Sequence, residues 1–398
     1  MTVVPGERAD VSFEDPRDSD RACRRRMESA KADLAFGNCD FSRRKLPMAR
    51  ETSVFSASII LPTVNRDEHL RQALASLAGV HVPEGWDVDL LVVDNGSTDN
   101  TEEIVRSSVL PRMAVRYLRV TRPGKSIALN AALAATSGEA VILTDDDIRF
   151  PERWLEAMCE PILSGRGMAV FGCICPPDHL KSLLTSDLLR SCFSVCDWWD
   201  WDRPRMMIGA NMAISRKILE KVPAFEPELG PGALGLLEDT LFSYQVEAAG
   251  FTIVNAGRDS LVEHHFDPSR LRRPPLLQKA ELEGRSLAFL YYHWLHSRMK
   301  FPALRQAVHT ARLAALRLLR QPGRRGEFDC PEWELRLLIK IAFCRRFRQE
   351  RRRPRLYDHR ALVRRVPDSV TVGETGRTGR AASEQQVAHQ TSVGPGDN

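Results

Sequence analysis

Short apolar runs alternate with helical patterns along the first part of the chain. Four runs predict buried strands, at Ser58–Thr63, Val88–Asp94, Val115–Val120 and Ala140–Leu143. Helices are predicted between them, at Glu68–Leu77, after an N-capping turn at Asn95–Thr98, and at Ser126–Ala135. This alternation predicts an α/β fold built on a parallel sheet with right-handed crossovers.

Beyond Pro151 the pattern becomes mixed. It predicts helices at Trp154–Leu163 and Asp239–Ala249, and strands at Met168–Cys173, Met206–Ser215 and Phe251–Asn255. From Pro274 onward the chain is helical, basic and apolar in pattern, with breaks at Pro322-Gly323 and Pro354. Residues 1–52 are polar and lack periodicity, which predicts a mobile arm. Residues 366–398 are rich in small polar residues, which predicts a disordered tail.

Charge is spread unevenly over the 398 residues, whose formal net charge is +5. The segment 298–365 holds 20 lysine or arginine residues against 6 acidic ones. Such a block suggests contact with anionic lipid, nucleic acid or phosphate groups, although a solvated helical face explains it equally well. Neither an N-terminal signal sequence nor an apolar run long enough to span a membrane is present, so a cytoplasmic location is expected. The nine cysteines lack paired zinc-site spacing and are predicted to be buried thiols.

The richest chemistry follows the fourth predicted strand, where Asp145, Asp146 and Asp147 stand in a row. Pro151 comes soon afterwards, so these acids lie on a loop at the carboxyl end of a strand, where ligands bind in open α/β sheets. Three adjacent carboxylates repel one another, and a hard divalent cation would offset that cost. An acidic turn or helix cap is the alternative.

The acids are the last of four features in a fixed order. Before them come Pro62-Thr63-x-Asn65-Arg66-x-Glu68, then Asp94-Asn95-Gly96-Ser97-x-Asp99, then Pro123-Gly124-Lys125-x-x-Ala128-x-Asn130. Together they resemble the N-terminal half of family-2 glycosyltransferases, which have the GT-A fold. Ile208–Ile214, Leu237-Glu238-Asp239 and Val262-Glu-His264-His265 resemble later motifs of that family. The resemblance covers roughly residues 56–268.

This resemblance implies an α/β fold in which a GT-A-like nucleotide-binding sheet has helices on both faces, plus a C-terminal helical extension. It divides the ordered chain into a nucleotide-sugar-binding half (53–155), an acceptor and catalytic half (156–270) and a basic helical extension (271–365). The implied activity is inverting transfer of a sugar from a nucleotide-diphosphate sugar to an acceptor hydroxyl, assisted by Mg²⁺ or Mn²⁺.

The resemblance assigns the metal to the acidic cluster. Asp145 and Asp147 are the preferred ligands. Asp146 stays a candidate because Thr144 stands where one register of the family pattern places the first acid. His264 or His265 could complete the metal or pyrophosphate site, and a structural histidine is the alternative.

The resemblance assigns nucleotide binding to residues near the strand ends. Asp94 is expected to contact the nucleoside, with a UDP-sugar favoured. Thr63, Arg66 and Glu68 border the same pocket, although Arg66 and Glu68 could form only an exposed ion pair. Gly124 would allow close backbone approach, and Lys125 would offer a point charge to phosphate.

Inversion needs a base that takes the proton of the acceptor hydroxyl, and Asp239 is the candidate, with Glu238 as its neighbour. Helix capping is the alternative for both. The Gly230–Gly235 segment before them is predicted to order when the donor binds. Acceptor or sugar contact is predicted for Trp198, Trp199 and Trp201, although tryptophans also fill cores. Asn211, in the small-residue strand, is predicted to lie near the acceptor.

Other classes fit less well. Nucleotidyl transfer and dinucleotide binding both favour glycines after the first strand, where Val64–Asp67 has none. A catalytically degenerate binding protein of this fold is disfavoured by the intact acids. Nucleic-acid binding would explain only the basic block. The acceptor is expected to be a carbohydrate or a lipid-linked sugar. Peripheral contact of Leu304–Leu319 and Leu335–Phe347 with anionic membrane would favour the latter, but packing against the catalytic part explains both segments equally well.

Overall fold

The computed structural model describes residues 55–201, 204, 206–320 and 330–365. The chain divides into two compact units, Met1–Arg365 and Val366–Asn398, and every described residue belongs to the first. The predicted arm at 1–52, the predicted tail at 366–398 and the predicted break at Pro322-Gly323 lie outside the described residues.

In the described part of the chain, seven strands form the central sheet. They span Ser56–Thr63 (β1), Asp87–Asp94 (β2), Ala114–Arg119 (β3), Ala140–Thr144 (β4), Ala169–Phe171 (β6), Asn211–Ser215 (β8) and Ile253–Asn255 (β9). Their order is β3-β2-β1-β4-β8-β6-β9. The first four are mutually parallel, whereas β8 runs antiparallel to both β4 and β6. The predicted parallel sheet is therefore confirmed, with an antiparallel addition.

Burial explains why the strands differ in pattern. β4 and β8 are buried along their whole length, and β1 is buried at every residue after Ser56. β3 forms an edge and alternates between exposed and half-buried residues. Continuous apolar runs are typical of strands covered on both faces, and alternation is typical of a half-solvated strand.

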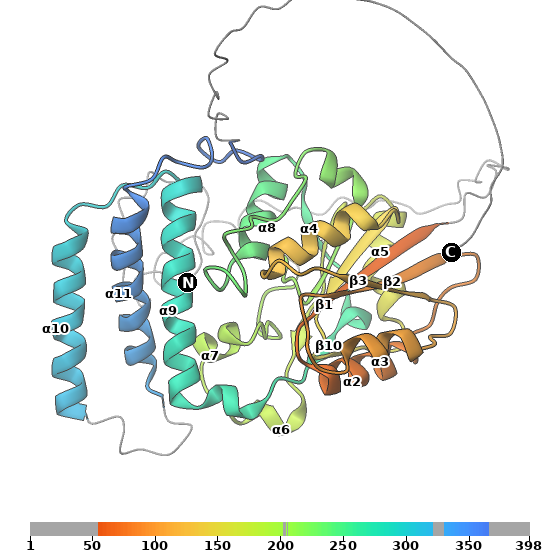
Figure 1. Cartoon of the computed structure of the whole chain (residues 1–398), viewed down its shortest axis with the longest axis horizontal. Coiled ribbons are helices and arrows are strands. Elements are labelled where there is room, and N and C mark those ends of the chain that lie inside the picture. Colours follow the sequence, from red (N-terminus) through yellow and green to blue (C-terminus); the bar gives the residue numbers. More distant parts are fainter. Residues whose placement is uncertain (1–54, 202–203, 205, 321–329, 366–398) are drawn as a thin grey trace, which may run out of the picture. The chain divides into compact units, whose positions relative to one another are not determined.

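Helices cover both faces of the sheet, as predicted. They are α2 (Asp67–Leu77), α3 (Thr101–Ser107), α4 (Lys125–Ala135), α5 (Trp154–Leu163) and α8 (Glu238–Ala248). Figure 1 shows α4 on the opposite side of the sheet from α2 and α3. Shorter elements lie near the acids: β5 (Ile148–Arg149), β7 (Ile174–Cys175), α6 (Asp178–Lys181), α7 (Asp187–Cys192) and β10 (Val262–His264). β5, β10 and β7 form a separate small sheet in that order.

The strand order places a ligand crevice. From β1 the chain moves outward through β2 to β3, and then returns to β4 on the other side of β1. The carboxyl ends of β1 and β4 therefore flank a point where the strand order reverses. Ligands of open α/β sheets bind at such points. Thr63 ends β1 and Asp145 follows β4, so both face this crevice.

The predicted C-terminal helical extension is present. It consists of α9 (Arg273–Phe289), a π-helical turn (Leu290–Trp294), α10 (Pro302–Arg320) and α11 (Glu332–Glu350). α11 packs against both α9 and α10 and lies between them (Figure 1). A Cβ added at Gly284 of α9 would collide with the Ile339 carbonyl and lie 2.8 Å from the Ala342 Cβ, so α9 and α11 approach closely.

Buried acids tie this extension to the rest of the unit. Glu350 is fully buried and accepts hydrogen bonds from His293 and Arg353 at 3.0 Å each. Arg353 also contacts Glu228 at 2.8 Å, and Arg364 contacts Glu228 at 2.7 Å. Glu228 lies just before the Gly230–Gly235 segment. The extension therefore reaches the surroundings of the predicted catalytic residues. No described helix combines the length and apolar composition needed to cross a bilayer.

Candidate active site

The loops after β1 and β4 meet through the acidic cluster. Asp146 and Asp147 are each 2% exposed. The Thr63 hydroxyl donates to Asp146 Oδ2 at 2.7 Å. Arg66 spans both acids, with Nη1 at 2.6 Å from Asp146 Oδ1 and Nη2 at 2.7 Å from Asp147 Oδ2. Thr63, Arg66 and the acids thus form one assembly at the crevice.

The two buried acids differ in the direction of their pKa shifts. Burial raises the pKa of Asp146 to about 7, even though Arg66 opposes the shift. Burial acts on Asp147 in the same direction, but His264 and Arg66 outweigh it and hold the pKa of Asp147 well below its ordinary value. Two adjacent carboxylates in a low dielectric rarely both ionise freely, so the charge concentrates on one of them. Asp147 is that acid.

His264 and His265 have different surroundings. His264 is 6% exposed, and its Nε2 lies 3.2 Å from Asp147 Oδ2. Its Nδ1 lies 2.7 Å from the Phe193 carbonyl oxygen and can donate a proton to it, while Nε2 faces Asp147. The His265 ring instead pairs with Glu263 at 2.9 Å. Of the two histidines, His264 presents its ring to the acids.

The donor set around Asp147 suits a divalent ion. Asp147 and His264 would supply a carboxylate oxygen and an imidazole nitrogen to such an ion. Oxygen and imidazole ligands also suit Mn²⁺. Arg66 uses the same carboxylate oxygen, and a bound ion would share it. Among the described residues, no three or more acids, histidines or cysteines are already gathered around one metal position.

Lys125 links the acidic loop to α8. Its Nζ lies 2.6 Å from Asp145 Oδ1 and 3.9 Å from Glu238 Oε1. Burial lowers the pKa of Lys125, but Asp145 and Glu238 outweigh burial and raise it above its ordinary value. Lys125 therefore stays charged between two carboxylates. The backbone N–H of Lys125 also donates to the Pro231 carbonyl at 2.9 Å, which holds the Gly230–Gly235 segment beside it.

Glu238 and Asp239 begin α8 and point in different directions. Leu237, just before them, has a φ of 74°, a left-handed conformation that is costly for leucine. Glu238 is 6% exposed and turns toward Lys125, and burial together with Asp239 raises the pKa of Glu238 to about 7. Asp239 accepts the Gly209 N–H at 3.0 Å and the Thr240 N–H at 2.7 Å. The pair lies within reach of Lys125, as a site spanning both halves requires.

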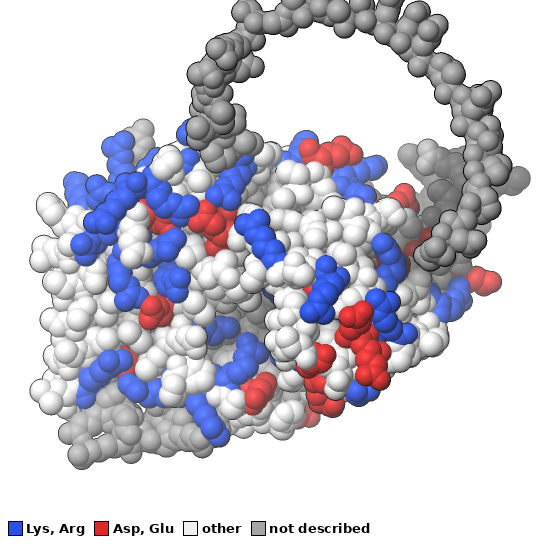
Figure 2. Space-filling model, viewed as in Figure 1, with Lys and Arg blue, Asp and Glu red and all other residues white. Residues whose placement is uncertain are grey.

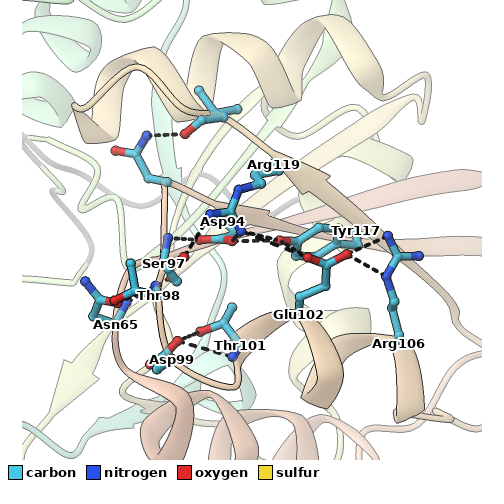
Figure 3. Close-up of polar contacts among 12 residues, drawn as sticks. Asn65, Asp94, Ser97, Thr98, Asp99, Thr101, Glu102, Arg106, Tyr117 and Arg119 are labelled. Carbon is cyan, nitrogen blue, oxygen red and sulfur yellow. Dashed lines mark hydrogen bonds and ion pairs between the residues drawn. The ribbon is translucent and has the colours of Figure 1, made fainter.

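Asp94 is fully buried at the end of β2. Figure 3 shows it among Ser97, Tyr117 and Arg119. Ser97 N–H donates to Oδ1 at 2.7 Å, the Tyr117 hydroxyl donates to Oδ2 at 2.6 Å, and Arg119 lies 3.1 Å from Oδ2. Burial alone would raise the pKa of Asp94, but the Ser97 and Tyr117 hydrogen bonds lower it below its ordinary value. Asp94 is thus a fixed anion, although it is not joined directly to the acidic cluster.

Some predicted residues lie elsewhere. Glu68 is exposed and contacts Gln72 of its own helix, so the structure does not bring it to the crevice. Gly124 has a φ of 129°, donates its N–H to Asn95 Oδ1 at 2.8 Å and packs against Gly232. The positive φ that glycine tolerates allows Gly124 to contact the loop that contains Gly232.

The α3 helix begins at Thr101, and its cap at Asn100 makes no side-chain hydrogen bond, so the predicted cap at Asn95–Thr98 was wrong.

Asn211 does not contact an acceptor, contrary to the prediction. It is fully buried in β8, its amide donates to the Cys173 and Ser260 carbonyls at 2.9 Å each, and its oxygen accepts from Trp154 Nε1 at 2.9 Å. Both amide hydrogens and the amide oxygen therefore have partners in the core.

The three tryptophans also divide. Trp199 stacks on Phe171 with ring centroids 5.7 Å apart, and Trp201 packs partly buried against the core. Trp198 is 45% exposed. Of the three, Trp198 is the one that leaves a broad face available to a sugar.

Residues not predicted from sequence also belong to the site. Tyr117 and Arg119 hold Asp94, and both come from the edge strand β3. Arg270 Nη1 lies 3.5 Å from Asp147 Oδ2. The polar positions of the Val115–Val120 run were a usable signal for Tyr117 and Arg119. Arg270 lies in a basic stretch that offers no such signal.

A central sheet with an acidic crevice at its reversal point fits the GT-A fold. The fold is shared with a mannosyltransferase of Pyrobaculum calidifontis solved with GDP-mannose and Mn²⁺. That match has a TM-score of 0.50 and 20% identity, and covers 74% of this chain and 87% of the other. Residues 58–222 match the glycosyl transferase family 2 model.

Curated relatives are similar over shorter stretches. A probable glycosyltransferase of Bacillus subtilis, YdaM, is 27% identical over 229 residues, which cover 53% of this chain and 51% of the relative. Glucosyl-3-phosphoglycerate synthase of Mycobacterium tuberculosis is 32% identical over 121 residues, which cover 28% of this chain and 35% of the relative. The chain thus spans about half or less of these relatives.

Proposed function

We propose that this protein transfers a glycosyl unit from a nucleotide-diphosphate sugar to an acceptor hydroxyl, with inversion at the anomeric carbon. The observation that carries the proposal is Lys125, which contacts Asp145 at 2.6 Å and lies 3.9 Å from Glu238. It joins the acids after β4 to the acidic pair that begins α8. One continuous site therefore holds both a diphosphate-binding part and a candidate base.

The donor would lie along the crevice. Asp94 is fully buried and held by Tyr117 and Arg119, so a hydrogen bond to the nucleoside would require one of these partners to give way. Arg66 and Lys125 would face the diphosphate. Asp147 and His264, with Asp145, would hold a divalent ion. Such an ion supplies positive charge that stabilises the departing nucleotide diphosphate. A UDP-sugar is the favoured donor, and the mannosyltransferase of the same fold, solved with GDP-mannose, keeps a guanine nucleotide as the alternative.

Asp239 would take the proton from the acceptor hydroxyl as the new bond forms. It is the less buried member of the Glu238–Asp239 pair. Gly209 and Thr240 hold its two oxygens by backbone N–H groups, which fixes its direction. Trp198 would offer its exposed face to a carbohydrate acceptor.

Asp239→Asn tests the base directly. Transfer should fall by about 10²–10⁴-fold, because the amide cannot accept the proton. Binding of UDP or GDP with Mn²⁺, measured by calorimetry, should be unchanged. Asp259→Asn, at an exposed aspartate, is the matched control and should transfer normally. If Asp239→Asn instead loses nucleotide binding while keeping its fold, Asp239 belongs to the nucleotide site and the assigned base is wrong.

A further inference from the structure

The helix α10 carries an exposed apolar stripe. Phe301, Leu304, Val308, Leu318 and Leu319 are 73%, 63%, 55%, 77% and 77% exposed. Leu304, Val308, Leu318 and Leu319 share one face of the helix, and Phe301 directly precedes it. Exposed alanines at positions 307, 311, 314 and 315 continue the same face. We call the five large residues, Phe301, Leu304, Val308, Leu318 and Leu319, the α10 stripe.

The opposite face of α10 is the one that packs on the protein. Leu313 is the buried residue of this helix, and Arg317 Nη2 lies 2.6 Å from the fully buried Glu334 of α11. Surface helices normally turn their apolar side inward, so the arrangement of α10 is reversed. In α11, by contrast, Leu335, Phe343 and Phe347 are each 1% exposed. For Leu335–Phe347 the structure therefore favours packing, one of the two alternatives, and of the two segments α10 alone keeps its apolar face outside.

Positive charge surrounds the stripe. The sequence from Met299 to Gly326 contains no aspartate or glutamate. Arg298, Lys300, Arg312 and Arg320 are exposed. Burial lowers the pKa of His309, and Lys340 and Arg312 lower it further, so the basic side chains gather beside this helix. Figure 2 shows the edge over α10 mostly white, with blue side chains next to it.

We propose that the α10 stripe is a docking surface for an anionic lipid bilayer. Leucine, phenylalanine and valine would enter the boundary between headgroups and acyl chains, while the neighbouring basic residues contact the headgroups. A contiguous exposed apolar surface of this kind marks an interaction site. A second copy of the chain fits less well, because two α10 helices face to face would bring positive charge together without any acidic residue in either helix. This docking does not depend on the transfer activity.

The test is co-sedimentation of the full chain with vesicles of phosphatidylcholine, with or without phosphatidylglycerol. The protein should bind the anionic vesicles and lose binding as salt is raised. Leu318→Asp/Leu319→Asp should weaken this binding by about tenfold or more. Leu304→Gln, at the other end of the stripe, provides a second and milder variant. Val109→Asp changes an 88% exposed valine in the loop after α3 and should bind as the unchanged protein does.

Circular dichroism and thermal unfolding should show that the variants stay folded, because the altered side chains have few internal contacts. Failure of the unchanged protein to bind anionic vesicles would overturn the proposal. Equal binding by the stripe variants would overturn it as well, as would equal binding to neutral vesicles. If Leu318→Asp/Leu319→Asp instead converts a dimer to a monomer in sedimentation velocity, the stripe is a contact between copies of the chain.

Discussion

His264 and His265 are adjacent in sequence, but their rings contact different residues. His264 Nε2 faces Asp147, and the His265 ring faces Glu263 near the surface. We predict that His264→Ala weakens Mn²⁺ binding by about 10–100-fold, whereas His265→Ala leaves it nearly unchanged. The measurement is the Mn²⁺ concentration that half-saturates the thermal stabilisation by UDP or GDP. Equal losses in both variants would contradict the assignment of His264.

Glu238 should leave a signature in the pH dependence of stability. Its pKa is raised from 4.5 to about 7 by burial and Asp239. Between these values the folded state keeps a proton that the unfolded state has released, so rising pH destabilises the folded state. Glu238→Gln removes this effect. The variant should therefore gain about 1–3 kcal/mol over the unchanged protein as pH rises from 4.5 to 7.

Chemical unfolding at several pH values measures this difference. Glu220→Gln, at an exposed glutamate, is the matched control. A difference between the unchanged protein and Glu238→Gln that stays constant with pH would show that Glu238 ionises at its ordinary pKa.

For individual residues, the sequence predicted which residue types lie at the site better than it predicted where their side chains point. The acids, Arg66 and Lys125 could be predicted because they follow strands whose ends must meet at one sheet edge. Asn211 could not, since its role depends on which side chains surround β8, and Trp154 and two distant carbonyls use its amide. Glu68 was equally undetermined, because the first turn of a helix offers both a site-facing and a solvent-facing direction.

Among the elements, the strands buried in the central sheet were predicted best. β1, β2 and β4 are long apolar runs, and their bounds agree with the predicted ones within two residues. The predicted strand at Met206–Ser215 was too long, because the strand begins only at Asn211. Met207 and Gly209 instead donate their backbone N–H groups to Ser243 and Asp239 of α8. Apolar sequence alone does not distinguish a strand from a buried loop that serves a helix N-terminus.

The contact between α9 and α11 gives an element-scale prediction. An added Cβ at Gly284 would collide with the backbone of α11. Replacing glycine by alanine in an exposed helix usually stabilises by about 1 kcal/mol. Gly284→Ala should instead destabilise by about 1–3 kcal/mol, because two packed helices must separate. Denaturant unfolding measures the change. A gain in stability would mean that α9 and α11 can shift apart freely.

For the molecule as a whole, Arg353 connects the helical extension to the loop before Glu238 and Asp239. It contacts Glu228 at 2.8 Å and Glu350 at 3.0 Å. Arg353→Ala should destabilise the unit by about 1–3 kcal/mol, because the fully buried Glu350 loses a partner. Arg365→Ala, which breaks an exposed pair with Asp358, should cost about 0–1 kcal/mol. Urea unfolding measures both variants, and similar small effects would show that the extension is only loosely attached.

The contacts of Glu228 with Arg353 and Arg364 also bear on how the protein is synthesised. Glu228 and its partner Arg364 are separated by 136 positions, so the loop before Asp239 is synthesised long before its anchor. At ordinary rates of translation this interval lasts on the order of ten seconds. Throughout this interval Glu228 lacks its arginine partners. The contacts of Glu228 with Arg353 and Arg364 can therefore form only after the C-terminal helices have been synthesised.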